Sequence, residues 1–381
     1  MRILCWGTYD TSKPRARILI SGLRQAGAEV TECHVDIWGD VVDKSQIRGF
    51  VRQFALAVRW LLAYPPLVWR LIRAEKPDLI LVGFPGILDV LIAAPLARLR
   101  GVPIAWDMFM SIFDTVAVDR KLVSRDGLAG RLLHRLEASA LRRCDFVFMD
   151  TRAHAKRIEA LFALPRGCIG AVWVGVEKAH FTTEPIMPVR VPRISHTEPL
   201  RVLFYGQFIP LHGIEVIIGA ARLTQDKPVA WRLIGTGQET GRIEHMLLEQ
   251  PLANVDWHKW VNYSALHNEI AEADVCLGIF GQSEKAASVI PNKVFQIVAM
   301  SKPLITRDSE AIRELLGSGP PCVTLVPPGN AEALADAVAC FLEHPRPVMR
   351  CHTLLMDRIG SDAVGKQCLE MLMQRFRKEP L

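Results

Sequence analysis

The stretch LRVLFYGQFIPLHGIEVIIGAA, residues 200–221, decides the fold. It opens with an apolar run typical of a buried strand, passes through two glycines, and continues with apolar residues at helical spacing. The first residues of the chain, MRILCWGTYD, begin in the same way. A strand that leads into a helix and then into another strand predicts a parallel sheet covered by helices on both faces. We therefore expect one such sheet to begin at residue 1 and a second at residue 200.

Strand-like runs alternate with helical segments on both sides of this stretch, and a chain of 381 residues exceeds what one core organises. Residues 182–199 hold four prolines and little helical periodicity, which indicates a linker. The prediction is an α/β protein of two Rossmann-like, doubly wound parallel-sheet domains facing each other across a cleft. Its parts are an N-terminal domain (1–181), the linker, a C-terminal domain (200–360), and a last helix (361–378) that packs back on the first domain.

The composition excludes several classes of protein. Half of the residues are apolar and 23% are charged, as in ordinary globular proteins. The nine cysteines are scattered without a CxxC spacing, so we expect reduced thiols and neither a disulfide framework nor a zinc site. The N-terminus lacks the apolar run of a signal peptide, and no uncharged stretch is long enough to span a membrane. These features predict a cytoplasmic location.

The first half of the chain is basic, with 27 Lys and Arg against 19 Asp and Glu in residues 1–190. Such a surface suits an anionic partner, although a merely basic surface explains it as well. Residues 47–76 carry six basic residues and one acidic residue, together with Phe and Trp. We predict two short helices there, separated at Pro65 and Pro66, that contact a membrane surface. The alternative is a helix with one face packed on the core and its arginines exposed to solvent.

Ligands of open α/β sheets bind at the carboxyl ends of the strands. Gly206 and Gly213 follow the strand at residue 200 and permit a tight turn before a helix. The free N–H groups of that helix, with His212, suit a phosphate. Gly235 begins a Gly-x-Gly after the next strand, which is weak as a dinucleotide motif but compatible with close approach of a ligand. The alternative is an ordinary strand–helix turn with a surface histidine, and on these residues alone it is the simpler explanation.

The segment CLGIFGQSEKAASVIPNKVFQ, residues 276–296, is the densest signal. Lys293 and Gln296 lie three residues apart and share one face of the helix expected there. A cation and an amide one turn apart suit a diphosphate beside a ribose, whereas a surface lysine and a capping glutamine are the structural alternative. The remaining candidates for ligand contact in this segment are Gly281, Lys285 and Asn292.

Two acidic residues follow the apolar run at residues 103–106. Asp107 lies at the end of this predicted strand, and Asp114 lies one loop further along the chain. A carboxylate there suits a general base or an acceptor of sugar hydroxyl hydrogen bonds. A helix N-cap is the alternative.

Taken together, these segments resemble the retaining glycosyltransferases of family four, which have the GT-B fold. The resemblance covers the whole chain and is carried by VLFYGQFIPLHGIEVIIGAA, WRLIGTG, EADVCLGIFG, PNKVFQIVAMSKPLITRDSEAIRELL, LVPPGNAEALADAV and, before the linker, VGVEKAHF. It implies transfer of a sugar from a nucleotide-sugar, UDP- or GDP-linked, without a metal or other cofactor. The donor would bind the C-terminal domain and the acceptor the N-terminal domain. Together with the basic, aromatic segment at residues 47–76, this predicts a lipid-linked or envelope polysaccharide acceptor at the inner face of the membrane.

The resemblance also implies residue roles. The phosphate-binding turn of the family falls on Gly206 to Gly213, where Gln207 and His212 replace the frequent Arg and Lys. The two glutamates typical of the family fall on Ser288 and Gln296, and Lys293 matches a variant with PNK at this point. Asp107 or Asp114 would contact the transferred sugar or the acceptor hydroxyl.

Two other functions remain open on the same fold. One is a nucleotide-sugar epimerase, and the other is a non-catalytic nucleotide-sugar-binding partner subunit, which the amide at residue 296 favours. Nothing in the sequence indicates a nucleic-acid partner.

Overall fold

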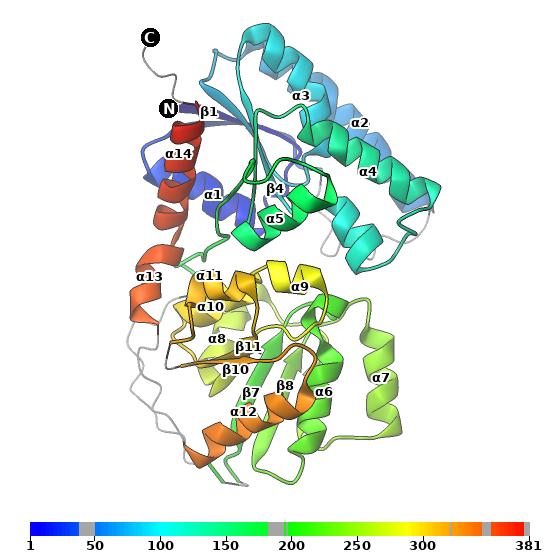
Figure 1. Ribbon diagram of the computed structural model, residues 1–381, viewed down its shortest axis with the longest axis vertical. Coiled ribbons are helices and arrows are strands. Elements are labelled where there is room, and N and C mark those ends of the chain that lie inside the picture. The colour runs from blue at the N-terminus through cyan, green and yellow to red at the C-terminus, as the bar shows by residue number, and fades with distance from the viewer. Residues whose placement is uncertain (38–49, 182–193, 196, 321, 345–351, 377–381) are drawn as a thin grey trace. The chain divides into compact units, whose positions relative to one another are not determined.

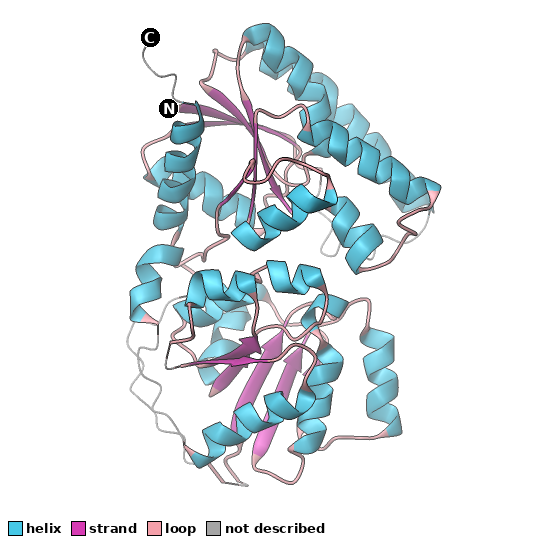
Figure 2. Ribbon diagram, in the orientation of Figure 1, coloured by secondary structure: helices cyan, strands magenta, loops and turns pink. Residues whose placement is uncertain are grey.

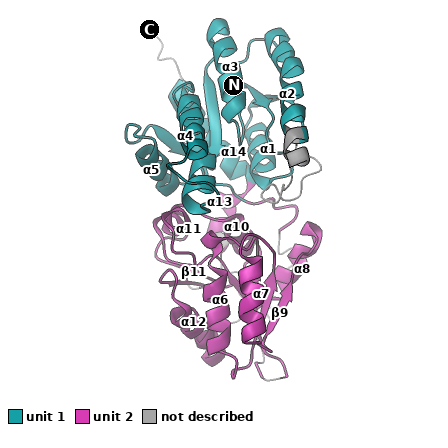
Figure 3. Cartoon of the chain, turned by 90° about the vertical axis from the view of Figure 1, so that its right-hand side faces the viewer, with its two compact units in different colours: residues 1–175, 361–381 teal, residues 176–360 magenta. Residues whose placement is uncertain are grey.

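A computed structural model describes residues 1–37, 50–181, 194–195, 197–320, 322–344 and 352–376. Helices and parallel strands alternate along the chain (Figures 1 and 2). The chain divides into two compact units, residues 1–175 with 361–381, and residues 176–360 (Figure 3). Most of the predicted linker, at 182–193 and 196, lies outside the described residues.

Unit 1 is built on a six-stranded parallel sheet in the order β2-β1-β3-β4-β5-β6. Apolar side chains cover both faces of this sheet, as expected when every strand is joined to the next through a helix. The strands are β1 (Arg2–Gly7), β2 (Glu29–His34), β3 (Leu79–Val82), β4 (Ile104–Phe109), β5 (Phe146–Met149) and β6 (Ile169–Ala171). The helices between them are α1 (Pro14–Gln25), α2 (Phe50–Arg73), α3 (Ile87–Arg100), η2 (Asp114–Asp119), α4 (Leu128–Leu141) and α5 (Arg152–Leu161).

The C-terminal helix α14 (Ser361–Phe376) belongs to unit 1, where it packs along α1. The two helices approach closely because Gly22 and Gly365 face each other. A Cβ atom on Gly22 would lie 2.0 Å from the carbonyl oxygen of Ser361. Residues at the two ends of the chain therefore cover the same face of one sheet.

Unit 2 contains a second parallel sheet, in the order β12-β11-β10-β7-β8-β9. Numbered within the unit, this is the order 3-2-1-4-5-6 of the doubly wound fold. The strands are β7 (Leu200–Tyr205), β8 (Val229–Ile234), β9 (Val255–His258), β10 (Val275–Leu277), β11 (Leu304–Arg307) and β12 (Val323–Val326). The helices are η3 (Pro210–His212), α6 (Ile214–Leu223), α7 (Thr240–Glu249), η4 (Tyr263–Ala265), α8 (Leu266–Glu272), α9 (Glu284–Ser288), α10 (Asn292–Ala299), α11 (Glu310–Leu316), α12 (Ala331–Glu343) and α13 (Thr353–Ile359).

One helix prediction is wrong, because α2 runs without a break through Pro65 and Pro66. Each proline removes a hydrogen bond to the carbonyl four residues earlier, here Leu61 and Leu62. These four residues are exposed, so water can bond the freed carbonyls. The opposite face keeps the helix in place through Ala63, Tyr64, Leu67 and Leu71, which are buried in the core.

The cysteines give a second correction. Seven of the described cysteines are free thiols, but Cys322 is disulfide-bonded. The expectation that every thiol is reduced is therefore wrong at this position. Sequence spacing did not show it because disulfide partners need to be close in space, not along the chain.

Candidate functional site

In a doubly wound sheet, ligands bind at the point where the strand order reverses, which in unit 2 lies between β7 and β10. Gly206 follows β7, and Gly281 lies in the loop after β10. These two loops are held together by backbone hydrogen bonds from the N–H groups of Phe280 and Gly281 to the carbonyls of His212 and Leu211, at 3.0 and 3.2 Å. A Cβ atom on Gly213 would lie 2.7 Å from the nitrogen of Gly281, so the contact requires glycine. The glycines predicted from the sequence thus bring the loops of two neighbouring strands together.

Lys293 lies beneath the turn at Gly206. A Cβ atom on Gly206 would be 3.0 Å from the Nζ atom of Lys293 and 3.1 Å from the Cε1 atom of His212, so all three residues meet. The backbone of Gly206 has a φ of 143°, which only glycine adopts readily. Gly235, after β8, supports the same turn, because its own Cβ atom would collide with the carbonyl oxygen of Gly206.

The ammonium group of Lys293 is buried, and among the described residues it has no hydrogen-bond partner. The ring of Phe204 lies close to it, with 3.7 Å between the ring centroid and Nζ. Burial lowers the pKa of Lys293 well below its usual value, because the charged form loses its hydration. A buried amine at a sheet's ligand-binding edge is a place for an anion.

Gln296 has a different environment from the one expected. Its Oε1 atom accepts a hydrogen bond of 3.0 Å from the hydroxyl of Tyr205, the last residue of β7. An amide oxygen has a second lone pair, so Gln296 can still accept one further hydrogen bond. The ribose contact remains a prediction.

The other predicted residues of unit 2 lie at the same edge of the sheet. The Nδ1 atom of His212 pairs with the carbonyl oxygen of Gln207, whose side chain is exposed. Lys285 is buried in the short helix α9, and Asn292 is the half-buried first residue of α10.

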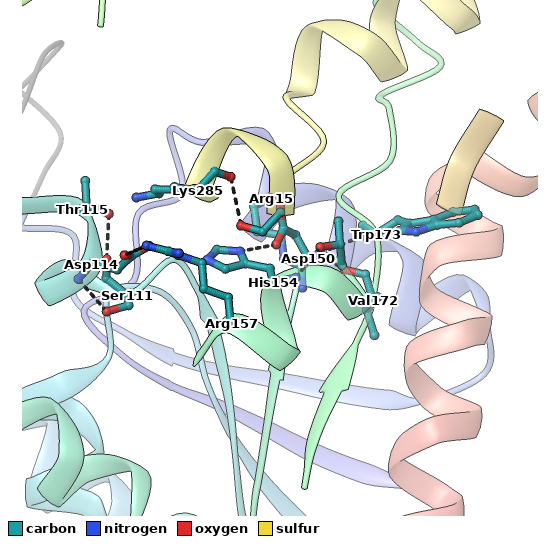
Figure 4. Close-up of polar contacts among 12 residues, drawn as sticks. Arg15, Ser111, Asp114, Thr115, Asp150, His154, Arg157, Val172, Trp173 and Lys285 are labelled. Atoms are coloured by element: carbon teal, nitrogen blue, oxygen red, sulfur yellow. Dashed lines mark hydrogen bonds and ion pairs between the residues drawn. The ribbon is translucent and has the colours of Figure 1, made fainter. Parts of the chain in front are cut away.

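In unit 1, the two candidate aspartates bind separate arginines. Asp107 lies within β4 and accepts two hydrogen bonds, of 2.9 and 2.8 Å, from Arg15 of α1, and both side chains are buried. Asp114, at the start of η2, binds Arg157 of α5 at 2.7 Å (Figure 4). Burial raises the pKa of Asp107, and the charge of Arg15 opposes this. Both carboxylates are thus used in ion pairs within the unit.

In unit 1 the strand order reverses between β1 and β3, and a pocket lies at the carboxyl ends of these two strands. Its free space is about 470 Å³, part of it open to solvent. Aromatic rings and charged groups line it, among them Tyr9, Asp10, Lys13, Phe84, Asp107 and Phe109. Of these residues, only Asp107 was a candidate from the sequence.

Sequence reasoning also missed a pair at the end of β5. Asp150 follows the strand directly, and His154 lies in the first turn of α5, with 2.6 Å between Oδ1 of the aspartate and Nδ1 of the histidine. The signal that could have found it is the spacing of four residues in DTRAH directly after an apolar run.

Comparison with known proteins agrees with this architecture. The family described as glycosyl transferases group 1 matches residues 199–344, and the family described as glycosyl transferase 4-like domain matches residues 11–169. The chain is 24% identical over 284 residues to the Escherichia coli (strain K12) protein described as a colanic acid biosynthesis glycosyl transferase, WcaI, with 72% of this chain and 68% of that protein covered. It is 26% identical over 281 residues to WbjE of Pseudomonas aeruginosa, described as a glycosyltransferase, with 70% and 66% covered.

Solved structures share the fold over nearly the whole length. Sucrose-phosphate synthase from Thermosynechococcus elongatus superposes with a TM-score of 0.70 at 17% identity, and 99% of each chain is covered. The Anabaena protein HepE in complex with UDP superposes with a TM-score of 0.66 at 14% identity, with 98% and 99% covered.

Proposed function

Because the chain belongs to the family-four glycosyltransferases and has the GT-B fold, we propose that it transfers a sugar, with retention of anomeric configuration, from a nucleotide-sugar to a lipid-linked or polysaccharide acceptor. The observation that carries the proposal is the buried amine of Lys293 beneath the turn at Gly206, for which the described part of the chain offers no hydrogen-bond partner. A diphosphate bound over this turn would supply the missing partner. HepE, of similar fold, has been solved with UDP and with UDP-glucose, which supports a donor of this class.

Retaining transfer of this kind needs the leaving diphosphate to be stabilised as its bond to the sugar breaks. In our proposal Lys293 supplies positive charge, and N–H groups at the start of a helix supply dipoles. No metal is required for this step, since the cation is part of the protein.

We place the acceptor in unit 1, at the pocket between the ends of β1 and β3. Tyr9, Phe84 and Phe109 offer aromatic faces to a sugar ring or an isoprenoid chain, and Lys13 offers a cation to a phosphate. WcaI is described by colanic acid biosynthesis, and a similar fold occurs in a galactosyltransferase of the lipopolysaccharide outer core, WaaB, with a TM-score of 0.61. These relatives support an envelope glycan as the acceptor.

We also propose that unit 1 contacts the inner membrane surface peripherally. Among the described residues, no helix is both long and apolar enough to cross a membrane. However, α2 exposes large apolar side chains beside its arginines, namely Leu61, Leu62, Trp69 and Ile72. A similar stripe runs along α4, with Leu128, Leu132 and Leu136 exposed near Arg131 and Arg135. Figure 1 shows α2, α3 and α4 in one unit, and α3 contacts both α2 and α4, so the two stripes lie on the helices that flank α3.

The test is a panel of UDP- and GDP-linked sugars, screened first by thermal shift and then with lipid-diphosphate acceptors. Binding to the native state raises the melting temperature, and transfer releases free nucleotide. The absence of binding to every donor would refute the proposal. A changed sugar without an acceptor would instead indicate an epimerase.

A non-catalytic role is the second candidate, and the bond between Tyr205 and Gln296 is the observation that favours it. If the amide oxygen is committed to Tyr205, the ribose has a weaker acceptor. Donor binding without turnover, both in the native protein and in Gln296→Glu, would support this candidate.

A further inference from the structure

Asp150 and His154 form a buried pair at the carboxyl end of β5. The side chain of His154 is fully buried and that of Asp150 nearly so. The hydroxyl of Thr151 accepts a hydrogen bond of 2.9 Å from the backbone N–H of His154 and caps α5, which fixes the backbone beneath the ring. Figure 4 shows the ring of His154 directed at the carboxylate of Asp150. The ring is therefore held in one orientation by its Nδ1 atom.

The second ring nitrogen has no such partner. Nε2 of His154 is buried, and no described residue forms a hydrogen bond with it. Leaving a buried polar atom unpaired is costly, and native proteins do so rarely. A carboxylate that fixes one nitrogen of an imidazole while the other is unoccupied is an arrangement suited to a ligand of that second nitrogen.

The surroundings of the pair indicate which ligand fits. Burial lowers the pKa of Arg15, but the carboxylates of Asp107 and Asp150 outweigh burial and raise it, so Asp150 lies within electrostatic range of the ion pair on β4. Arg15 neutralises Asp107, and the nearby pair of Asp114 and Arg157 is neutral as well. Of these three pairs, only that of Asp150 and His154 carries a net negative charge when the imidazole is neutral.

An uncharged hydroxyl group fits this pair better than a phosphate does, because it adds no second negative charge beside Asp150. A hydroxyl can donate to Nε2 of a neutral ring and can accept from Nε2 of a protonated ring, so it suits both states. β5 is an interior strand of the sheet of unit 1, and ligands of this fold bind at the carboxyl ends of the strands.

We propose that Nε2 of His154, oriented by Asp150, binds a sugar hydroxyl of the substrate. The inference rests on the proposed function and adds to it a residue in direct contact with the sugar. His154 is then a binding residue, and Asp150 acts through it as a positioning residue.

Two substitutions separate this role from a purely structural one. In His154→Asn, the amide nitrogen takes the place of Nδ1 and keeps the bond to Asp150, but nothing replaces Nε2. In His154→Gln, the longer side chain carries a polar atom to the place of Nε2 and loses the bond at Nδ1. If His154 binds a sugar hydroxyl, Asn weakens sugar binding about three- to tenfold, as the loss of one neutral hydrogen bond predicts, and Gln weakens it less.

Two measurements on the same variants show whether the hydroxyl belongs to the transferred sugar or to the acceptor. Donor affinity, measured by calorimetry with the UDP- and GDP-sugars that bind the wild type, reports on the transferred sugar. The KM for the lipid-diphosphate acceptor reports on the acceptor sugar. His352 is a matched control in unit 2, because it is also buried, with Nε2 bonded to the carbonyl of Lys302 at 3.0 Å and Nδ1 unpartnered in the described structure. His352→Asn should leave both measurements unchanged.

A loss in His154→Asn that exceeds the loss in His154→Gln, in either measurement and with an unchanged melting temperature, supports the inference. Equal values for the wild type and His154→Asn in both measurements overturn it, as does a greater loss in Gln than in Asn. If the wild type binds no donor at all, the proposed function fails first, and the two failures are thereby distinguished.

Discussion

Replacing Lys293 with methionine should make the protein more stable and weaken its donor binding. The lysine is 5% exposed, its Nζ atom finds no hydrogen-bond acceptor in the described structure, and burial lowers its pKa. Methionine has a similar length and volume and suits the apolar surroundings that Phe204 provides. The substitution therefore removes a cost to folding without creating a cavity.

The expected change in the free energy of unfolding follows from the hydrogen bonds that Lys293 does not form in the described structure. A buried polar group without a partner costs about 1–3 kcal/mol, so Lys293→Met should raise the free energy of unfolding by about that amount. The melting temperature should rise by about 2–4 °C for each kcal/mol in a domain of this size. Loss of a charge-assisted contact to the diphosphate, about 1.5–3 kcal/mol, should weaken donor binding roughly 10- to 150-fold.

Lys302 provides the matched control within the same unit. It is also buried, but its Nζ atom donates to the carbonyls of Ala271 and Ala273 at 2.5 and 2.8 Å. Lys302→Met should therefore lower the free energy of unfolding by about 1–3 kcal/mol and leave donor affinity unchanged. Urea unfolding and calorimetric titration with the donor measure both quantities. If Lys293→Met destabilises the protein as Lys302→Met does, or binds the donor as tightly as the wild type, the reasoning about Lys293 is wrong.

Three further predictions follow from the same contacts. Burial lowers the pKa of Lys293 in the free protein, and a bound diphosphate would raise it, so donor binding should take up a proton at pH values between the two. Donor affinity should therefore fall by up to tenfold per pH unit as the pH rises through that range. A dissociation constant that does not change with pH would contradict this. Asp107→Leu should lower the free energy of unfolding of unit 1 by about 3–5 kcal/mol, because it leaves the buried Arg15 without its ion-pair partner. The double variant with Arg15→Met should recover part of that free energy, as measured by urea unfolding. Strictly additive losses in the two single variants would argue against a coupled pair. Leu61→Glu should reduce binding to anionic lipid vesicles about tenfold or more in a flotation assay, whereas Leu248→Glu, at a still more exposed position of unit 2, should have no effect. Equal behaviour of the two variants would exclude α2 as the contact.

Local patterns in the sequence predicted the architecture well. Strand–helix alternation and a second beginning at residue 200 indicated two parallel sheets, and both are present. The helix expected to carry Lys293 and Gln296 is also found, as α10. The break expected at Pro65 and Pro66 is absent, because tertiary packing of one helix face outweighs the local cost of the prolines.

The partners of the site residues could not be read from the sequence. Arg15 and Asp107 are 92 residues apart along the chain, and Tyr205 and Gln296 are 91 apart. Such contacts depend on which strands become neighbours, and spacing along the chain carries no information about them. Asp150 and His154 are close in sequence, but a four-residue spacing becomes informative only once the strand before it and the burial around it are known.

The measurement that tests the central claim most directly is analysis of the products formed from the best-binding nucleotide-sugar and a lipid-diphosphate acceptor. The account predicts free nucleoside diphosphate and a new glycoside with the anomeric configuration of the donor, both detected by NMR and both strongly reduced in Lys293→Met. A donor recovered intact, a glycoside of inverted configuration, or full activity in Lys293→Met would contradict it.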